Sequence, residues 1–188
     1  MGKHLVLVGA GAAHVDFLDR WARRPVPGVQ VTLLTKQRRF LDPALLPYWV
    51  GGLTDTAYPA IEIEALAHRA KAAWPDAQAA QLDAATRTLH LDDGSLLRCD
   101  WISCDMEPVQ SRALTDIAIA GARKNGLFVR PLEAFLALWP QVLALAASRP
   151  VSLAVIADAD GGFEALPLCF AIRQRLPGAA VTLVTGGE

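Results

Sequence analysis

The alternation of apolar and polar positions is clearest near the N-terminus. Residues 5–8 form a short apolar run, Leu-Val-Leu-Val, which predicts a buried parallel strand. Residues 15–22 carry apolar side chains at helical spacing and predict an amphipathic helix, which the proline- and glycine-rich segment 25–28 ends. A second apolar run at 29–34 predicts another strand. Together these patterns predict a strand–helix–strand (βαβ) unit, the local architecture that binds dinucleotides.

The turn between the first predicted strand and the helix contains Gly9 and Gly11. Gly9 permits a tight turn, and Gly11 permits the backbone to approach a pyrophosphate closely. The helix N-terminus then presents free N–H groups and the positive end of the helix dipole to that anion. His14 stands where the G-x-G-x-x-G pattern has its third glycine. The turn therefore predicts a nucleotide site with one departure from the pattern.

The second predicted strand ends at Thr35 and Lys36. A dinucleotide fold often carries an acidic residue here, which accepts a hydrogen bond from the ribose 2′-OH. Thr35 can still hydrogen-bond a ribose, whereas Lys36 offers no acceptor. A solvated strand end is an equally good interpretation of these two residues.

The strand–helix–strand pattern recurs near the C-terminus. This second unit consists of a strand at 151–156, a helix at 163–176 and a strand at 181–185. The elements expected between the two units include a helix at 61–73, a hairpin with an Asp-Gly turn at 87–99, a strand at 100–105 and a helix at 131–147. The predicted fold class is α/β, with a doubly wound, mainly parallel sheet and an antiparallel hairpin insertion. We expect a first domain at 1–148 and a truncated second βαβ unit at 149–188.

Composition and charge narrow the function classes. The formal net charge of −1 leaves no basic excess to neutralise phosphates, which argues against a nucleic-acid partner. No apolar run approaches the length of a transmembrane helix, and the N-terminal run is too short for a signal peptide, so a cytoplasmic location is expected. The three cysteines suggest no disulfide framework, and the histidines show no metal-ligand spacing.

Several motifs in this order resemble those of one known family. The motifs are Gly9–Val15, Pro25–Val29 leading into Thr32–Thr35, Leu45-Leu46-Pro47 with Val50-Gly51-Gly52, the Asp92-Asp93-Gly94 hairpin turn, and Val129–Leu136. They resemble the pyridine nucleotide–disulfide oxidoreductase superfamily, whose members are two-domain FAD/NAD(P)-binding flavoproteins with a Rossmann-like fold. The NADH dehydrogenase-like and sulfide:quinone reductase-like branch is the most similar, and within it the flavoprotein module that is fused to selenophosphate synthase in some bacteria.

The resemblance implies that the first unit binds FAD and that the second binds NAD(P)H, which passes a hydride to the flavin. The cofactor contacts that it implies are Gly9, Gly11 and the backbone of Ala12 and Ala13 at the pyrophosphate, Thr35 and Lys36 at the adenosine ribose, Ala79 near the adenine, and Asp105 in the segment that passes the pyrophosphate. It implies no particular catalytic residue and no metal.

The second unit and the segment after the 100–105 strand depart from the family pattern. Ala157 and Ala159 replace the first two glycines of the second turn, and Asp158 and Asp160 place carboxylates where a phosphate pair would sit. These departures disfavour NAD(P)H binding. Where the family has small residues that let the chain pass the pyrophosphate, this sequence has the bulky Met106 and two acids, Asp105 and Glu107. No redox cysteine pair follows the first helix, which disfavours a disulfide-reductase mechanism.

Two functions are consistent with the sequence. The first is an FAD-dependent oxidoreductase-type protein acting on an unknown small-molecule redox substrate, either as part of a longer protein or as a shortened relative. The alternative is a degenerate flavoprotein-like module without catalysis, which acts as a scaffold or dimerisation domain. A lone βαβ unit exposes sheet edge and apolar surface, so we expect it to pack on the first domain or to form a homodimer.

Overall fold

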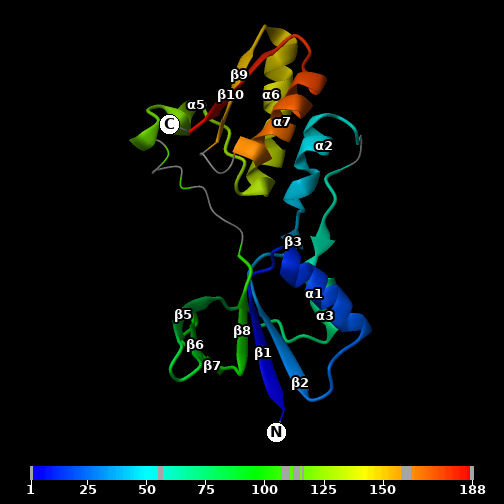
Figure 1. Ribbon diagram of the computed structural model, residues 1–188, viewed down its shortest axis with the longest axis vertical. Helices are drawn as coiled ribbons and strands as arrows, with labels where there is room; N and C mark the ends of the chain where they lie inside the picture. The colour runs from blue at the N-terminus through cyan, green and yellow to red at the C-terminus, as the bar shows by residue number, and fades with distance from the viewer. Residues whose placement is uncertain are drawn as a thin grey trace. The chain divides into compact units, whose positions relative to one another are not determined.

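The chain folds into two compact units, each assembled from two segments of the sequence. The computed structural model describes residues 2–54, 57–106, 111, 115, 117–157 and 162–186 (Figure 1). The N-terminal unit comprises residues 1–40 and 60–108, and the C-terminal unit comprises residues 41–59 and 109–188. Each unit has its own hydrophobic core.

The N-terminal unit is built on a parallel sheet of three strands. The strands are β1 (Lys3–Val8), β2 (Val29–Leu34) and β8 (Trp101–Cys104), in the order β2-β1-β8. In this register Leu7 of β1 lies opposite Leu33 of β2 and Ser103 of β8. The continuous apolar runs of β1 and β2 fit this position because a parallel sheet is covered on both faces. Both strands of the predicted N-terminal βαβ unit are therefore confirmed.

Two helices cover one face of this sheet (Figure 1). They are α1 (Ala12–Arg23) and α3 (Ile63–Ala70). Their apolar faces meet the strands through Leu18 and Leu66, which are fully buried together with Leu7 and Leu33. A side chain of this size contributes roughly 1.5–3 kcal/mol when it is fully buried, so burial rather than helix propensity holds the helices on the sheet.

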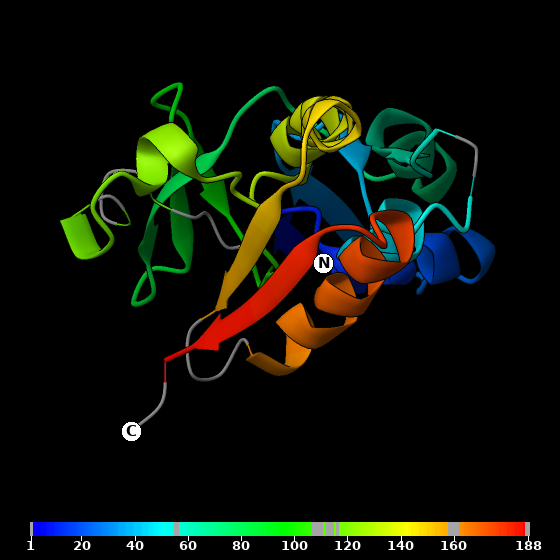
Figure 2. The same ribbon diagram turned by 90° about the horizontal axis from the view of Figure 1, so that it is seen from above.

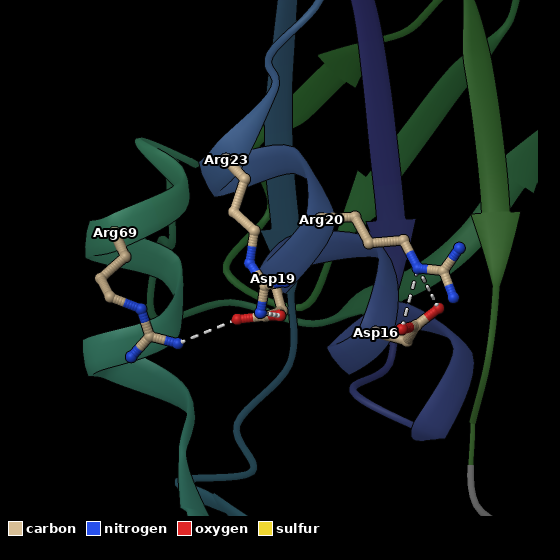
Figure 3. A network of polar contacts seen from close by, with 5 residues as sticks. All are labelled: Asp16, Asp19, Arg20, Arg23 and Arg69. Atoms are coloured by element: carbon tan, nitrogen blue, oxygen red, sulfur yellow. Dashed lines mark hydrogen bonds and ion pairs between the residues drawn. The ribbon is translucent and has the colours of Figure 1, made fainter.

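Ion pairs add a small surface network to the same two helices (Figure 3). Asp16 pairs with Arg20 at 2.9 Å, and Asp19 pairs with Arg23 one turn of helix further on. Arg69 of α3 lies 3.6 Å from Asp19. All five side chains are exposed, and exposed pairs of this spacing contribute about 0.3–0.5 kcal/mol each. The network therefore adds little to the packing of α1 on α3.

The opposite face of the parallel sheet carries an antiparallel sheet. Its strands are β5 (Ala79–Asp83), β6 (Thr88–Leu91) and β7 (Leu96–Arg98), in the order β5-β6-β7. The tip of the β6–β7 hairpin contains Gly94 at a φ of +84°, which confirms the hairpin predicted from the Asp-Gly turn. Leu89 and Leu91 of β6 share a buried cluster with strands β1 and β2. Near the end of the parallel sheet, β3 (Arg39–Phe40) pairs antiparallel with β4 (Ile61–Glu62).

The C-terminal unit contains the second predicted βαβ unit. Strands β9 (Ser152–Ala157) and β10 (Ala180–Thr185) pair in parallel, and α7 (Gly162–Arg175) connects them and runs along one side of the pair (Figure 2). Two further helices belong to this unit, α6 (Leu132–Ser148) and α2 (Leu46–Val50). Among the described residues, this unit also contains the 3-10 turn η1 (Pro43–Leu45) and the short helix α5 (Ala122–Asn125).

One buried cluster joins the helices of the C-terminal unit. Val50 of α2, Phe135 and Trp139 of α6, and Ile172 of α7 are all buried in it. The compact units thus group α6 with α7, whereas the predicted domain boundary falls between them, after residue 148. The physical reason for the grouping is that α6 has a broad apolar face, which α7 and α2 cover.

Candidate functional site

The glycine turn between β1 and α1 is hydrogen-bonded to both neighbouring strands. The N–H of Gly9 donates to the carbonyl of Leu34 at the end of β2 (2.9 Å). After β8, the N–H of Asp105 donates to the carbonyl of Val8 (2.8 Å), and the carbonyl of Asp105 accepts from the N–H of Gly11 (3.0 Å). The turn therefore lies at the carboxyl edge of the parallel sheet, where open α/β sheets bind their ligands.

The carboxylate of Asp105 lies at the N-terminus of α1. Its Oδ2 atom accepts a hydrogen bond from the backbone N–H of His14, at 3.1 Å. The N-cap residue of this helix is Gly11, which has no side chain to cap it, and no acidic residue stands in the first turn. Asp105 therefore caps α1 from the end of β8. Like an N-cap aspartate, it satisfies a free N–H and places a negative charge at the positive end of the helix dipole.

The two glycines of the turn make room for Asp105. A Cβ atom at Gly9 would lie 2.2 Å from the carbonyl oxygen of Asp105, and one at Gly11 would lie 2.4 Å from its Oδ1. Gly9 in addition has a φ of +90°, a conformation that other L-residues rarely adopt. Both glycines are thus needed for a close approach, and the group that approaches is part of the chain itself.

Two backbone donors at this helix end remain open. Within the part of the chain that the structure describes, no group accepts a hydrogen bond from the N–H of Ala12 or Ala13, and both residues are exposed. These donors fit an anion. With the Asp105 side chain in this place the position does not fit a pyrophosphate, because the carboxylate holds the neighbouring N–H of His14 and would repel a phosphate at that distance.

His14 fastens the turn to β8. Its side chain is 3% exposed, and its Nδ1 lies 2.8 Å from the carbonyl oxygen of Gly9 while its Nε2 lies 2.9 Å from the hydroxyl of Ser103. Because the carbonyl can only accept, Nδ1 carries a proton and donates it to this contact. The residue that replaces the third glycine of the pattern is therefore a structural link between turn and sheet.

The predicted ribose contacts, Thr35 and Lys36, bind other groups of the protein. Thr35 is buried; its hydroxyl accepts from the N–H of Gln37 (3.1 Å) and its carbonyl from the indole N–H of Trp74 (2.8 Å). Lys36 forms an ion pair with Asp92 of the hairpin turn. The hydrogen bond to Asp92 raises the pKa of Lys36, and the same bond lowers the pKa of Asp92.

The other residues that the sequence singled out lie in both units. Ala79, expected near the adenine, begins β5, pairs with Leu91 and packs against the buried cluster beneath the antiparallel sheet. Met106, expected to crowd the pyrophosphate, is exposed, and its Cγ would lie 3.0 Å from a Cβ at Gly9. In the second unit, Ala157 ends β9, whereas Asp158, Ala159 and Asp160 lie outside the described residues.

The described residues contain no cluster of three or more metal-ligating side chains. All three cysteines are free thiols; Cys99 and Cys169 are buried, which raises the pKa of both, and Cys104 is exposed. None of the described helices has the length and apolar character needed to cross a bilayer.

Comparison with known proteins identifies the fold. No model of a known protein family matches the sequence, and no curated protein is significantly similar to it. Solved structures do match. The sulfide:quinone oxidoreductase of Aquifex aeolicus superposes on 98% of this chain with a TM-score of 0.73 at 15% identity. The NADH oxidase of Lactobacillus brevis superposes on 98% with a TM-score of 0.67 at 16% identity.

The chain has a Rossmann-like FAD/NAD(P)-binding fold. The predicted fold class is thereby confirmed, and the structural neighbours are flavoproteins of the pyridine nucleotide–disulfide oxidoreductase family. A third neighbour, the NAD-dependent persulfide reductase of A. fulgidus, matches 97% of this chain with a TM-score of 0.65 at 17% identity. The chain spans 43%, 40% and 34% of the Aquifex, Lactobacillus and A. fulgidus chains, less than half of each.

The first prediction concerns the approach of Asp105 to Gly9. Gly9→Ala adds a methyl group against a backbone carbonyl, and Gly28→Ala is the matched control, because Gly28 also has positive φ but nothing lies within 4 Å of its added Cβ. The positive φ alone costs about 1–2 kcal/mol. We expect Gly9→Ala to lower the free energy of unfolding by a further 1–3 kcal/mol or so, as overpacking does. Urea denaturation measures the free energy of unfolding of both variants. Equal losses in Gly9→Ala and Gly28→Ala would refute the close approach of Asp105 to Gly9.

The second prediction concerns His14. His14→Ala removes a buried ring and leaves the Gly9 carbonyl and the Ser103 hydroxyl without their partner. The expected loss is about 2–4 kcal/mol in the free energy of unfolding. His90→Ala is the control, because His90 is exposed on β6 and its loss should stay within about 0.5 kcal/mol. A loss for His14→Ala as small as that of the control would contradict the assigned link.

Proposed function

We propose that the N-terminal unit is the flavin-nucleotide unit of an FAD-dependent, oxidoreductase-type protein. One observation carries the proposal: a glycine turn stands at the carboxyl edge of a Rossmann-type sheet, and no group among the described residues accepts from the N–H groups of the exposed Ala12 and Ala13. The fold shared with flavoproteins supports it. The proposal extends to the nucleotide site alone, since this chain spans less than half of those proteins.

Occupation of that site requires the Asp105 side chain to leave the helix N-terminus. A phosphate that took all the N–H groups of the first turn would compete with the carboxylate for the His14 N–H. Thr35 and Lys36 would have to exchange contacts with Gln37 and Asp92 for contacts with a ribose. The unchanged site therefore favours weak binding over the tight retention of a resident cofactor.

The second candidate function is a non-catalytic scaffold that pairs through the C-terminal unit. The observation in its favour is the outer face of the β9–β10 pair, where Ile156 is 54% exposed and Val184 is 44% exposed. Parallel strands are ordinarily covered on both faces. A second copy of the chain would cover these side chains.

The finer parts of the resemblance remain predictions. NAD(P)H is assigned no residues in the C-terminal unit, because the turn after β9 lies outside the described residues except for Ala157. Fusion to selenophosphate synthase and a cytoplasmic location likewise rest on the sequence alone.

The third prediction tests the nucleotide site by calorimetric titration with FAD. Ala13→Glu places a negative charge beside the open N–H groups, so we expect FAD affinity to fall by about tenfold or more. The thermal stability of the free protein should not fall, because an acid in the first turn stabilises a helix. Ala84→Glu, at an exposed alanine in the β5–β6 turn, is the control and should leave FAD affinity unchanged. Equal FAD affinities in both variants would contradict the proposed site.

The fourth prediction tests the scaffold. We expect the protein to have the mass of a dimer in light scattering and Ile156→Lys to shift it to the monomer, because a buried unpaired charge disfavours the interface. Leu96→Lys replaces a side chain that is 64% exposed on β7, in the N-terminal unit, and should leave the mass unchanged. A monomeric wild-type protein at high concentration would eliminate this candidate.

A further inference from the structure

The position that a cofactor's pyrophosphate takes in a Rossmann turn contains a carboxylate of this chain. We propose that Asp105 is an intramolecular occupant of that position, which caps α1 in the free protein and competes with any phosphate ligand. The inference deepens the proposed function, on which its ligand-binding part rests. Its structural part, the capping of α1, stands on the contact between Asp105 and His14 alone.

The backbone of Asp105 is held by the sheet and the turn, whereas its side chain is held at the helix N-terminus by the N–H of His14. Two hydrogen bonds hold the backbone, one to Val8 (2.8 Å) and one from Gly11 (3.0 Å). The residue is only half-buried, so the carboxylate borders on solvent. Release of the helix N-terminus therefore needs a rotation of one side chain and no change in the sheet.

Occupation by the carboxylate acts on a phosphate ligand in two ways. The carboxylate accepts the hydrogen bond of the His14 N–H, which would otherwise be open to a phosphate. It also adds a negative charge a few ångströms from the phosphate position. The helix dipole and the N–H groups can stabilise either anion, but the carboxylate is always present at high effective concentration. The free protein therefore favours its own carboxylate over a ligand at low concentration.

The same strand provides a matched control. Asp100 stands immediately before β8 as Asp105 stands immediately after it, and its Oδ2 also accepts from a backbone N–H, that of His4, at 2.8 Å. Asp100 pairs in addition with Lys3, at 2.7 Å, and no helix begins there. Loss of either carboxylate removes a hydrogen bond to the backbone, but only loss of Asp105 uncovers a helix N-terminus.

The fifth prediction compares Asp105→Ala, Asp105→Asn and Asp100→Ala in thermal denaturation, with and without inorganic pyrophosphate. Without added anion, Asp105→Ala should melt roughly 2–4 °C below wild type, as expected for the loss of one helix cap in a chain of this size. Pyrophosphate should bring the melting temperature of Asp105→Ala back to that of wild type. It should raise the melting temperatures of wild type and Asp100→Ala much less. Asp105→Asn keeps an oxygen acceptor without the charge, so its response should lie between wild type and Asp105→Ala.

Titration with FAD is the second arm of the experiment. We expect Asp105→Ala to bind FAD at least tenfold more tightly than wild type, and Asp100→Ala to bind it as wild type does. If pyrophosphate stabilises Asp105→Ala no more than Asp100→Ala, the proposed occupancy is wrong, whatever FAD does. If pyrophosphate rescues Asp105→Ala but no variant binds FAD, the occupancy holds and the FAD-binding function fails. Should Asp105→Ala fail to fold, the comparison of Asp105→Asn with wild type decides in the same way.

Discussion

The carboxyl edge of the parallel sheet depends on one close approach, that of Asp105 to the glycine turn. The backbone of Asp105 bonds to the end of β1 and to the turn that follows it, and its side chain bonds to the first turn of α1. Asp105 thereby links strand β8, the turn and the helix to one another. Two positions without side chains, Gly9 and Gly11, are required for it.

His14 complements this approach from within the core. In a dinucleotide-binding turn the third glycine allows the helix to pack closely on the strand. Here an imidazole stands at that position and bonds to the turn on one side and to Ser103 of β8 on the other. Asp105 and His14 thus hold the turn against the same strand, one at the surface and one in the interior.

The two sides of the C-terminal unit differ in burial. Its helices share a well-packed cluster around Phe135, Trp139 and Ile172, whereas the outer face of β9 and β10 leaves Ile156 and Val184 exposed. One side of this unit therefore has the burial of a domain core, whereas the other leaves large apolar side chains exposed.

The sequence by itself determined most of the elements and the fold class. Apolar runs such as residues 5–8 and 29–34 indicated buried parallel strands, and the Asp-Gly turn indicated the hairpin, because these signals depend on neighbouring residues alone. In the structure, the first turn of α1 contains no acidic residue, and its N-cap residue, Gly11, has no side chain to cap it. Which group supplies that cap could not be deduced, since Asp105 lies 91 positions from His14 in the sequence.

Only the tertiary structure decided what the glycine turn holds. The sequence assigned Gly9, Gly11 and Asp105 to the same cofactor, and the structure brings all three together, but with the carboxylate in contact with the helix. It likewise directs Lys36 to Asp92 and the ring of His14 to Ser103. These are contacts between side chains distant in sequence, set by the packing of the sheet and by the need of each buried or charged group for a partner.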